Sequence, residues 1–241
     1  MVESEAGPGD RPAEATIPAG GFGSWLRDVR AAIREDADSD VPCDGCTACC
    51  RSSQFIHIAP TETDALANIP RELLFPAPGR PAGHVLMGYD DQGACPMLVD
   101  DACSIYRHRP TTCRTYDCRV LAATGLGLGS DGGDVQPLIA VRARRWRFDA
   151  PAADDRASQD AVRAAARFVT EQRVALTVGL EAGGEHPAIP TNPMQVAVLA
   201  VDIADVFLGP DDDDASAAVA DPGLEAVRVA ISGRRRAAGE R

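Results

Sequence analysis

Eight cysteines are the residues of this sequence whose type and spacing could do chemistry, and all of them lie in its first half. The first four form the run CDGCTACC, in which two-residue spacers let successive thiolates turn inward around one centre. The other four are spread more widely after that run. The pattern predicts a metal site whose candidate ligands are Cys43, Cys46, Cys49, Cys50, Cys95, Cys103, Cys113 and Cys118.

The type of metal follows from the softness of the ligands. Thiolates select zinc or iron–sulfur clusters, and four cysteines satisfy either. Three closely spaced cysteines followed by a distant Cys-Pro are typical of bacterial ferredoxins, which favours a [4Fe–4S] cluster held by Cys43, Cys46, Cys49 and Cys95. The other thiols would form a second site or stay redox-active, and they are Cys50, Cys103, Cys113 and Cys118. The Cys-Asp-Gly-Cys turn is also typical of a zinc knuckle, so zinc is the open alternative.

The order of these cysteines and their neighbours resembles the YkgJ-type cysteine-cluster family, which is described as a zinc- or iron-chelating CxxCxxCC domain. The sequence has CxxCxxCC, then Cys-Pro-x-Leu, then Cys-x-Ile-Tyr-x-x-Arg-Pro-x-x-Cys-Arg-x-Tyr-x-Cys, over roughly Pro42 to Arg119. The matching residues besides the cysteines are Pro96, Leu98, Ile105, Tyr106, Arg109, Pro110, Arg114 and Tyr116. The resemblance implies metal binding and, for some relatives, a link to flagellin lysine methylation.

Three functions are consistent with this pattern. The leading hypothesis is an iron–sulfur protein that acts in electron transfer or as a redox accessory of an unidentified partner. The alternatives are a zinc-stapled interaction module and a relative of the flagellin-type lysine N-methyltransferases. Tyr106, Arg109, Arg114 and Tyr116 would either position the second cysteine group through hydrogen bonds or serve ordinary packing.

The elements that must position the cysteines follow from local patterns. Apolar spacing predicts a helix over Phe22–Ile33 capped by Ser24, and alternation predicts a short strand over Gln54–Ile58 that carries His57. Thr61–Asp64 resembles a capping box.

Further along the cysteine region, Asp90–Gly93 resembles the turn of a hairpin. Arg109-Pro110 is expected to start a helix, because proline suits the first helical position. A strand is expected near Leu138–Phe148, with a solvent face made by Arg142, Arg144, Arg145 and Arg147.

The sequence as a whole predicts a helix-rich α+β fold. A cysteine-bound metal core with short hairpins would occupy residues 21–151, after a disordered tail at 1–20. A C-terminal helical lobe would occupy 152–241, with helices over Ser158–Leu180 and Thr191–Leu208 and an acidic linker near 210–221.

Net charge and hydropathy limit which partners and which cellular compartment we expect for this protein. The net charge of −12 opposes binding to phosphate backbones and anionic membranes, so we expect neither nucleic acid nor membrane as a partner. The sequence has no apolar run long enough to cross a bilayer, and its first residues lack the features of a secretory signal. We therefore expect a cytoplasmic protein, in which clustered thiols serve metals rather than disulfides.

Overall fold

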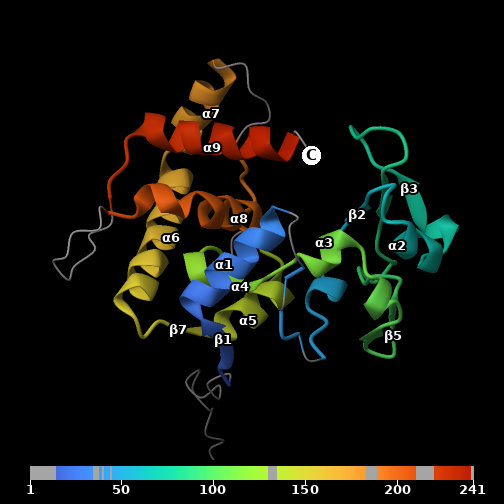
Figure 1. The fold of residues 1–241 in the computed structure, drawn as a ribbon. Helices are drawn as coiled ribbons and strands as arrows, with labels where there is room; N and C mark the ends of the chain where they lie inside the picture. The colour runs from blue at the N-terminus through green and yellow to red at the C-terminus, as the bar shows by residue number, and fades with distance from the viewer. Residues whose placement is uncertain are drawn as a thin grey trace, which may run out of the picture.

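The computed structural model describes residues 15–34, 38–39, 41–43, 45–129, 135–182, 189–209 and 220–239. Long helices gather on one side of the molecule, and most of the short strands and turns lie on the other (Figure 1). This arrangement confirms the predicted helix-rich α+β fold. Within the described residues, no helix is both long enough and apolar enough to cross a membrane.

The helical side is built around one apolar core. Its helices are α1 (Phe22–Ile33), α4 (Arg119–Thr124), α5 (Pro137–Arg145), α6 (Ala153–Glu171), α7 (Arg173–Ala182), α8 (Pro193–Ile203) and α9 (Leu224–Gly239). Helix α6 packs against α8, where Ala165 and Ala200 are fully buried and their small side chains allow the two backbones to approach closely. The same core contains Leu121 from α4 and Ala140 from α5. Helices on both sides of the predicted domain boundary at residue 151 therefore pack together, and the boundary itself stays a prediction.

Three of the predicted helices are confirmed in type, and two of them differ in extent. The helix predicted over Phe22–Ile33 has those bounds, although Ser24 donates to the carbonyl of Gly21 instead of capping the helix. The second predicted helix, Ser158–Leu180, is divided at Gln172 into α6 and α7. In the third, Pro193 is the first residue of α8, and a 3-10 helix, η4 (Ala204–Phe207), completes the segment.

The strand-bearing side holds most of the cysteines. A three-stranded antiparallel sheet has the order β2 (Ile56–Ile58), β4 (Val85–Met87) and β3 (Leu74–Pro76), and β5 (Leu98–Val99) pairs with β6 (Ala102–Cys103). Short helices connect these strands: α2 (Thr63–Asn68), α3 (Thr111–Arg114), η1 (Cys49–Arg51), η2 (Arg71–Leu73) and η3 (Tyr106–His108). A second, smaller apolar core contains Ile58, Ala65, Ile69, Met87 and Ile105.

Two local predictions on this side were wrong. The hairpin turn is not Asp90–Gly93, which forms an isolated turn closed by a hydrogen bond from the Asp90 N–H to the Ala94 carbonyl. The hairpin strands are β5 and β6, whose turn at Asp100 and Asp101 has the positive φ angles that a tight two-residue hairpin requires.

The capping box was also predicted wrongly. Helix α2 begins at Thr63, and no side chain caps its first turn. Glu62 precedes the helix and directs its carboxylate to other backbone N–H groups.

The strand predicted near Leu138–Phe148 is largely a helix. Pro137 starts α5, which continues to Arg145, and only then does β7 (Trp146–Asp149) begin. Three of the four arginines therefore lie in the last helical turn, where cations interact favourably with the helix dipole, rather than on a strand. In a helix, residues two apart do not share a face, so Arg142 packs over the Trp146 ring whereas Arg144 is exposed.

Strand β7 pairs in parallel with β1 (Ile17–Gly21), so Ile17 lies opposite Trp146. The end of the predicted disordered tail is thus a strand. Residues 1–14 of that tail, and residues 210–219 of the predicted acidic linker, lie outside the described residues.

Candidate metal site

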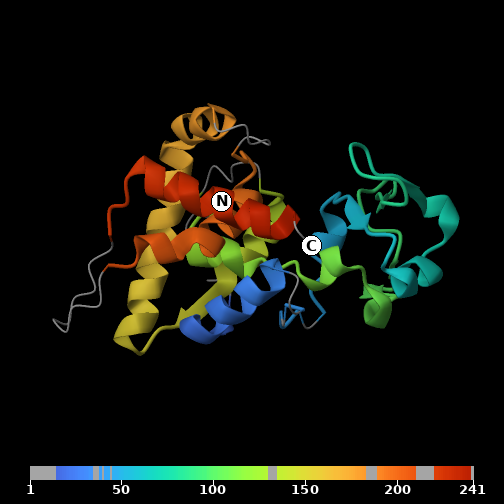
Figure 2. The same cartoon turned by 45° about the horizontal axis from the view of Figure 1, so that its top comes forward.

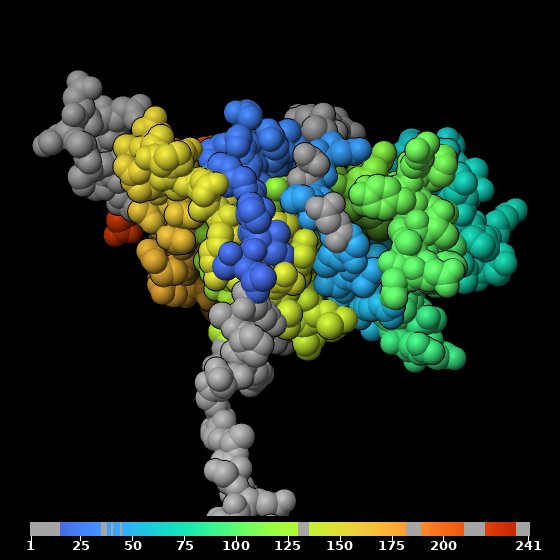
Figure 3. Space-filling view, turned by 90° about the horizontal axis from the view of Figure 1, so that it is seen from below, coloured from blue at the N-terminus to red at the C-terminus, as the bar shows by residue number. Residues whose placement is uncertain are grey.

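All eight cysteines line one cavity of about 430 Å³ between the helical side and the strand-bearing side. The helical side contributes Ile139, Arg142 and Trp146 to its wall, and the strand-bearing side contributes Met87 and Ile105 among others. The segment around η1, light blue in Figures 1 and 2, lies between α5 and the strands. Seen from below, the same light-blue segment fills the space between the yellow-green and the green parts of the surface (Figure 3). All eight thiols are free and partly exposed.

Four of the thiols form one mutually interacting group, which we call the Cys113 group: Cys50, Cys95, Cys103 and Cys113. Burial, followed by the nearby thiols of the other three, raises the pKa of Cys113 to about 12. Burial also raises the pKa of Cys95 and that of Cys103, and Cys50 adds to both effects. Each member therefore lies close enough to the others to influence its ionisation.

The backbone explains why these four meet. The Cys95 N–H donates to the Cys50 carbonyl at 2.7 Å, which joins the two cysteine-bearing segments. The hairpin of β5 and β6 then folds Cys103 back beside Leu98. Helix α3 carries Cys113 to the same place. The backbone N–H groups of Met97 and Ile105 point at the sulfurs of Cys95 and Cys103 and lower the pKa of each.

A second group, which we call the Cys118 group, contains Cys43, Cys46 and Cys118. Burial raises the pKa of Cys118 to about 11; the indole N–H of Trp146 opposes that rise, and Cys43 and Cys46 add to it. The Cys46 N–H donates to the Cys43 carbonyl, which closes the CDGC turn, and Gly45 adopts the positive φ of 70° that this turn requires.

Cys49 lies between the two groups. Its thiol donates a hydrogen bond to the neighbouring sulfur of Cys50, which raises the pKa of Cys49 and lowers that of Cys50 to about 7. Cys43 and Cys113 also raise the pKa of Cys49, so this thiol is near a member of each group. Cys49 can therefore complete the Cys118 group to four ligands.

The predicted partition of the thiols into two centres stays a prediction. We expected Cys95 beside Cys43 and Cys46, as in a ferredoxin, and Cys118 beside Cys113. In the structure the Cys95 backbone pairs with Cys50, Cys95 raises the pKa of Cys113, and Cys43 raises that of Cys118, which precedes α4; these contacts favour a different division of the thiols.

The eight thiols line the same cavity but are not arranged as a complete metal site. Among the described residues, no three Cys, His, Asp or Glu side chains are close enough together to form a ready-made metal site. Metal sites are seldom formed before the metal binds, since the ligands close on the ion and release their protons. The donor set fits zinc or iron, because it consists of free soft thiols with backbone and indole N–H groups directed at the sulfurs.

Two arginine–aromatic pairs line the cavity. The guanidinium carbon of Arg109 lies 3.7 Å from the ring centre of Tyr106, and that of Arg142 lies 4.7 Å from the ring of Trp146. Arg109 lowers the pKa of thiols in both groups, including Cys43 and Cys113. The family motif had marked Arg109 and Tyr106, whereas sequence reasoning gave Arg142 and Trp146 no role at the site.

The other polar candidates have different positions. Tyr116 also lines the cavity, whereas Arg114 donates to the Thr111 hydroxyl and pairs with Asp38. His57 lies on β2 as predicted, with its Nε2 2.9 Å from Nδ1 of His84.

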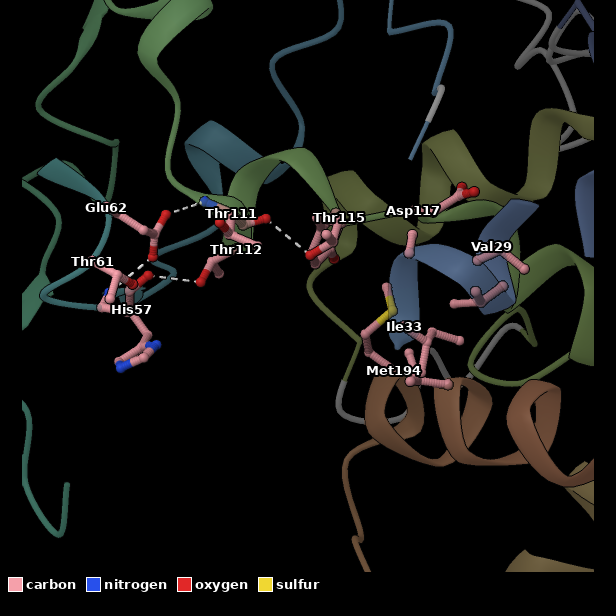
Figure 4. A pocket seen from close by; sticks show the side chains of 15 residues that line it. Val29, Ile33, His57, Thr61, Glu62, Thr111, Thr112, Thr115, Asp117 and Met194 are labelled. Carbon is pink, nitrogen blue, oxygen red and sulfur yellow. Dashed lines mark hydrogen bonds between the residues drawn. The ribbon is translucent and has the colours of Figure 1, made fainter. Parts of the chain in front are cut away.

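His57 lines a second cavity of about 420 Å³, which has a polar wall and an apolar wall (Figure 4). On the polar wall, the Glu62 carboxylate accepts hydrogen bonds from the N–H groups of Ala59 and Thr111 at 2.8 and 2.6 Å. The Thr112 hydroxyl donates to the His57 carbonyl at 2.7 Å. These bonds attach α3, and with it Cys113, to the strand-bearing side.

Comparison with known proteins identifies one segment of the chain. Residues 42–126 match the model of the CxxCxxCC family, which is described as a "Putative zinc- or iron-chelating domain". The matched segment contains all eight cysteines and ends before α5 and β7. No curated protein and no solved structure matches the chain. The match confirms the predicted family resemblance and zinc or iron as the metals that its description names.

Proposed function

We propose that this protein, whose residues 42–126 match a zinc- or iron-chelating domain family, binds two thiolate-ligated metal centres and acts in electron transfer or as a redox accessory. Iron–sulfur clusters are the proposed groups. One would be held by Cys50, Cys95, Cys103 and Cys113, and the other by Cys43, Cys46, Cys49 and Cys118. We place this activity in the cytoplasm, where thiols stay reduced and serve metals, with an unidentified redox protein as the partner.

The observation that carries this proposal is the cavity lined by eight free thiols, all of them partly exposed. Cysteine is among the residue types most often fully buried, so partial exposure of all eight cysteines is a notable feature of the cavity. Partial exposure of every candidate ligand therefore favours a centre that exchanges electrons with a partner over an internal staple. An iron–sulfur cluster, when bound, supplies one-electron chemistry at such a position.

The charge around the cavity also supports metal–thiolate centres. A centre with four thiolates carries negative charge that a nearby cation stabilises. Arg109 lowers the pKa of Cys50 and Cys103, and Arg142 lowers that of Cys43, so each group has a guanidinium beside it. In an acidic protein, these arginines favour the ionised form of the ligands.

A zinc-stapled interaction module is the second candidate, and exposed aromatic side chains beside the cavity favour it. Phe55 lines the cavity and is 55% exposed, and its ring centre lies 5.2 Å from that of Tyr89, which is 43% exposed. Phe75 packs edge-on against Phe55. Aromatic residues are enriched at protein interfaces, so this surface supports a protein partner under either candidate function. The methyltransferase alternative stays a prediction.

Anaerobic purification followed by iron, sulfide and zinc analysis tests the proposal. We expect a brown protein with stoichiometric iron and sulfide whose visible absorption bleaches when a reductant is added. A colourless protein that contains zinc and no sulfide would support the interaction module instead. Metal-free protein with eight freely titrating thiols, whose stability does not change when either metal is added, would contradict both, because bound metal normally contributes to folding free energy.

A further inference from the structure

Trp146 directs its indole N–H at one of the candidate ligands. Its Nε1 lies 3.2 Å from Sγ of Cys118 and donates a hydrogen bond to it, and its side chain is only 2% exposed. Trp146 follows α5 and begins β7, so it lies outside the segment that matches the family model. A residue from the rest of the chain therefore contacts a sulfur of the Cys118 group.

Arg142 connects Trp146 to the other end of that group. It lies on the preceding turn of α5 and stacks over the Trp146 ring. Its Nη2 donates to the carbonyl of Pro42 at 3.1 Å, immediately before Cys43. Trp146 and Arg142 thus contact both the segment that enters the CDGC turn and Cys118.

The surrounding fold holds Trp146 in one orientation. Strand β7 pairs with β1, which places Ile17 opposite Trp146, and Ala143 on α5 is fully buried in the main core. The indole N–H of Trp146 is therefore held in place before any metal binds. Hydrogen bonds to ligating sulfurs withdraw electron density from them and tune the metal, and loss of such a partner typically weakens metal binding.

We propose that Trp146 is a positioning residue for the metal centre of the Cys118 group, that its N–H···S hydrogen bond orients Cys118 and reduces electron donation from its thiolate, and that Arg142 holds the ring in place. This inference rests on the proposed function, because it requires that Cys118 ligates a metal. It assigns a role in the site to α5 and β7, which the family match does not include.

The test uses the metal-free full chain titrated with Co²⁺ alone under anaerobic conditions, and compares Trp146→Phe with Trp25→Phe. Trp25 is the matched control because it is also buried, at 4% exposure, and its indole N–H donates to Asp117 at 2.9 Å instead of to a sulfur. The sulfur-to-cobalt charge-transfer band and the Co²⁺ dissociation constant are measured for each protein. Neither readout depends on catalytic activity.

We expect Trp146→Phe to weaken Co²⁺ binding at one of the two centres by about tenfold. We also expect its charge-transfer band to move to longer wavelength, because a thiolate without the hydrogen bond gives up an electron more easily. Trp25→Phe should change both quantities less, because its indole N–H donates to Asp117, the residue before Cys118, and not to a sulfur. If Trp146→Phe fails to fold, as judged by circular dichroism, replacement of Trp146 by benzothienylalanine keeps the ring shape, removes only the N–H donor and should give the same two changes.

The outcomes separate this inference from the proposed function. A full-length unsubstituted chain that binds no Co²⁺ would contradict the proposed function itself. Normal Co²⁺ binding by the unsubstituted chain, with an unchanged band and affinity in the variant that lacks the N–H donor, would overturn the role of Trp146 and leave the metal sites intact.

Discussion

The backbone N–H of Cys95 lies 2.7 Å from the carbonyl oxygen of Cys50 and donates a hydrogen bond to it. This bond joins the CxxCxxCC run to the Cys-Pro segment and brings Cys50 and Cys95 together. Cys49, the neighbour of Cys50 in η1, has no such backbone bond to Cys95; its thiol donates a hydrogen bond to the Cys50 sulfur and lies near Cys43 and Cys113.

The proposed division of the thiols between two centres predicts how much metal each single and double variant loses. Cys95→Ser and Cys113→Ser should each remove about half of the metal, because each disables the same four-ligand centre. The double variant with both Cys95→Ser and Cys113→Ser should lose no more metal than either single variant. Cys95→Ser combined with Cys118→Ser should lose nearly all of the metal. Metal analysis of the anaerobically purified proteins measures this. If Cys95→Ser instead fails to add to Cys43→Ser, the ferredoxin-like partition is correct and ours is wrong.

The thiol of Cys50 should react first in the metal-free protein. The hydrogen bond from Cys49 lowers the pKa of Cys50 from its ordinary value of 9.0 to about 7, while burial and neighbouring thiols raise that of Cys113 to about 12. At a pH between these two values, iodoacetamide should label Cys50 well before Cys113, because the thiolate is the nucleophile. Peptide mass spectrometry over time measures both rates. Equal rates at the two positions would contradict the assignment.

The same hydrogen bond predicts a pH dependence of stability. Because the folded pKa of Cys50 is the lower one, its thiolate stabilises the metal-free fold fully above pH 9.0, and this contribution is lost as the pH falls through about 7. Cys49→Ala removes the S–H donor and should flatten this part of the stability profile. Urea unfolding across that pH range provides the measurement, and Cys49→Ser, which keeps a donor, serves as the control.

Leu121 connects the cysteine region to the main core. It lies on α4, the helix that begins directly after Cys118, and its side chain is fully buried. Leu121→Ala should lower the free energy of unfolding by about 3 kcal/mol, because it removes apolar contacts and leaves a cavity. Leu138→Ala on α5, where the side chain is 47% exposed, should change it by less than about 0.5 kcal/mol. Similar losses in the two variants, measured by urea unfolding, would show that α4 is not part of the stable core.

Glu62 holds α3 in place through two backbone hydrogen bonds. Glu62→Ala should cost about 2 kcal/mol, because it leaves the N–H groups of Ala59 and Thr111 without their carboxylate acceptor. Glu62→Gln keeps one acceptor oxygen and should cost less, and Glu72→Ala at an exposed position is the control. Hydrogen exchange at the Thr111 N–H reports the loss directly. Unchanged protection of that amide in Glu62→Ala would refute this role.

Local patterns in the sequence were sufficient for features that neighbouring residues determine. The helix over Phe22–Ile33 follows from its apolar spacing, and α8 follows from Asn192, whose side chain caps it, and from Pro193 at its first position. The zinc- or iron-type ligand set follows from soft thiolates at short spacings, which is a chemical property of the residues themselves. The strand expected where α5 lies was wrong because Pro137 starts a helix there, in which Arg142 and Arg144 do not share a face.

The tertiary structure decided which thiols meet and what surrounds them. Cys95 could join either group as far as spacing is concerned, and it is placed by a backbone hydrogen bond to Cys50 that no local pattern encodes. Trp146 reaches Cys118 because β7 pairs with β1, near the other end of the chain, and because α5 packs into the main core. The thiols themselves are a property of the sequence, whereas their partners depend on contacts between segments far apart in it, and only the folded chain brings those segments together.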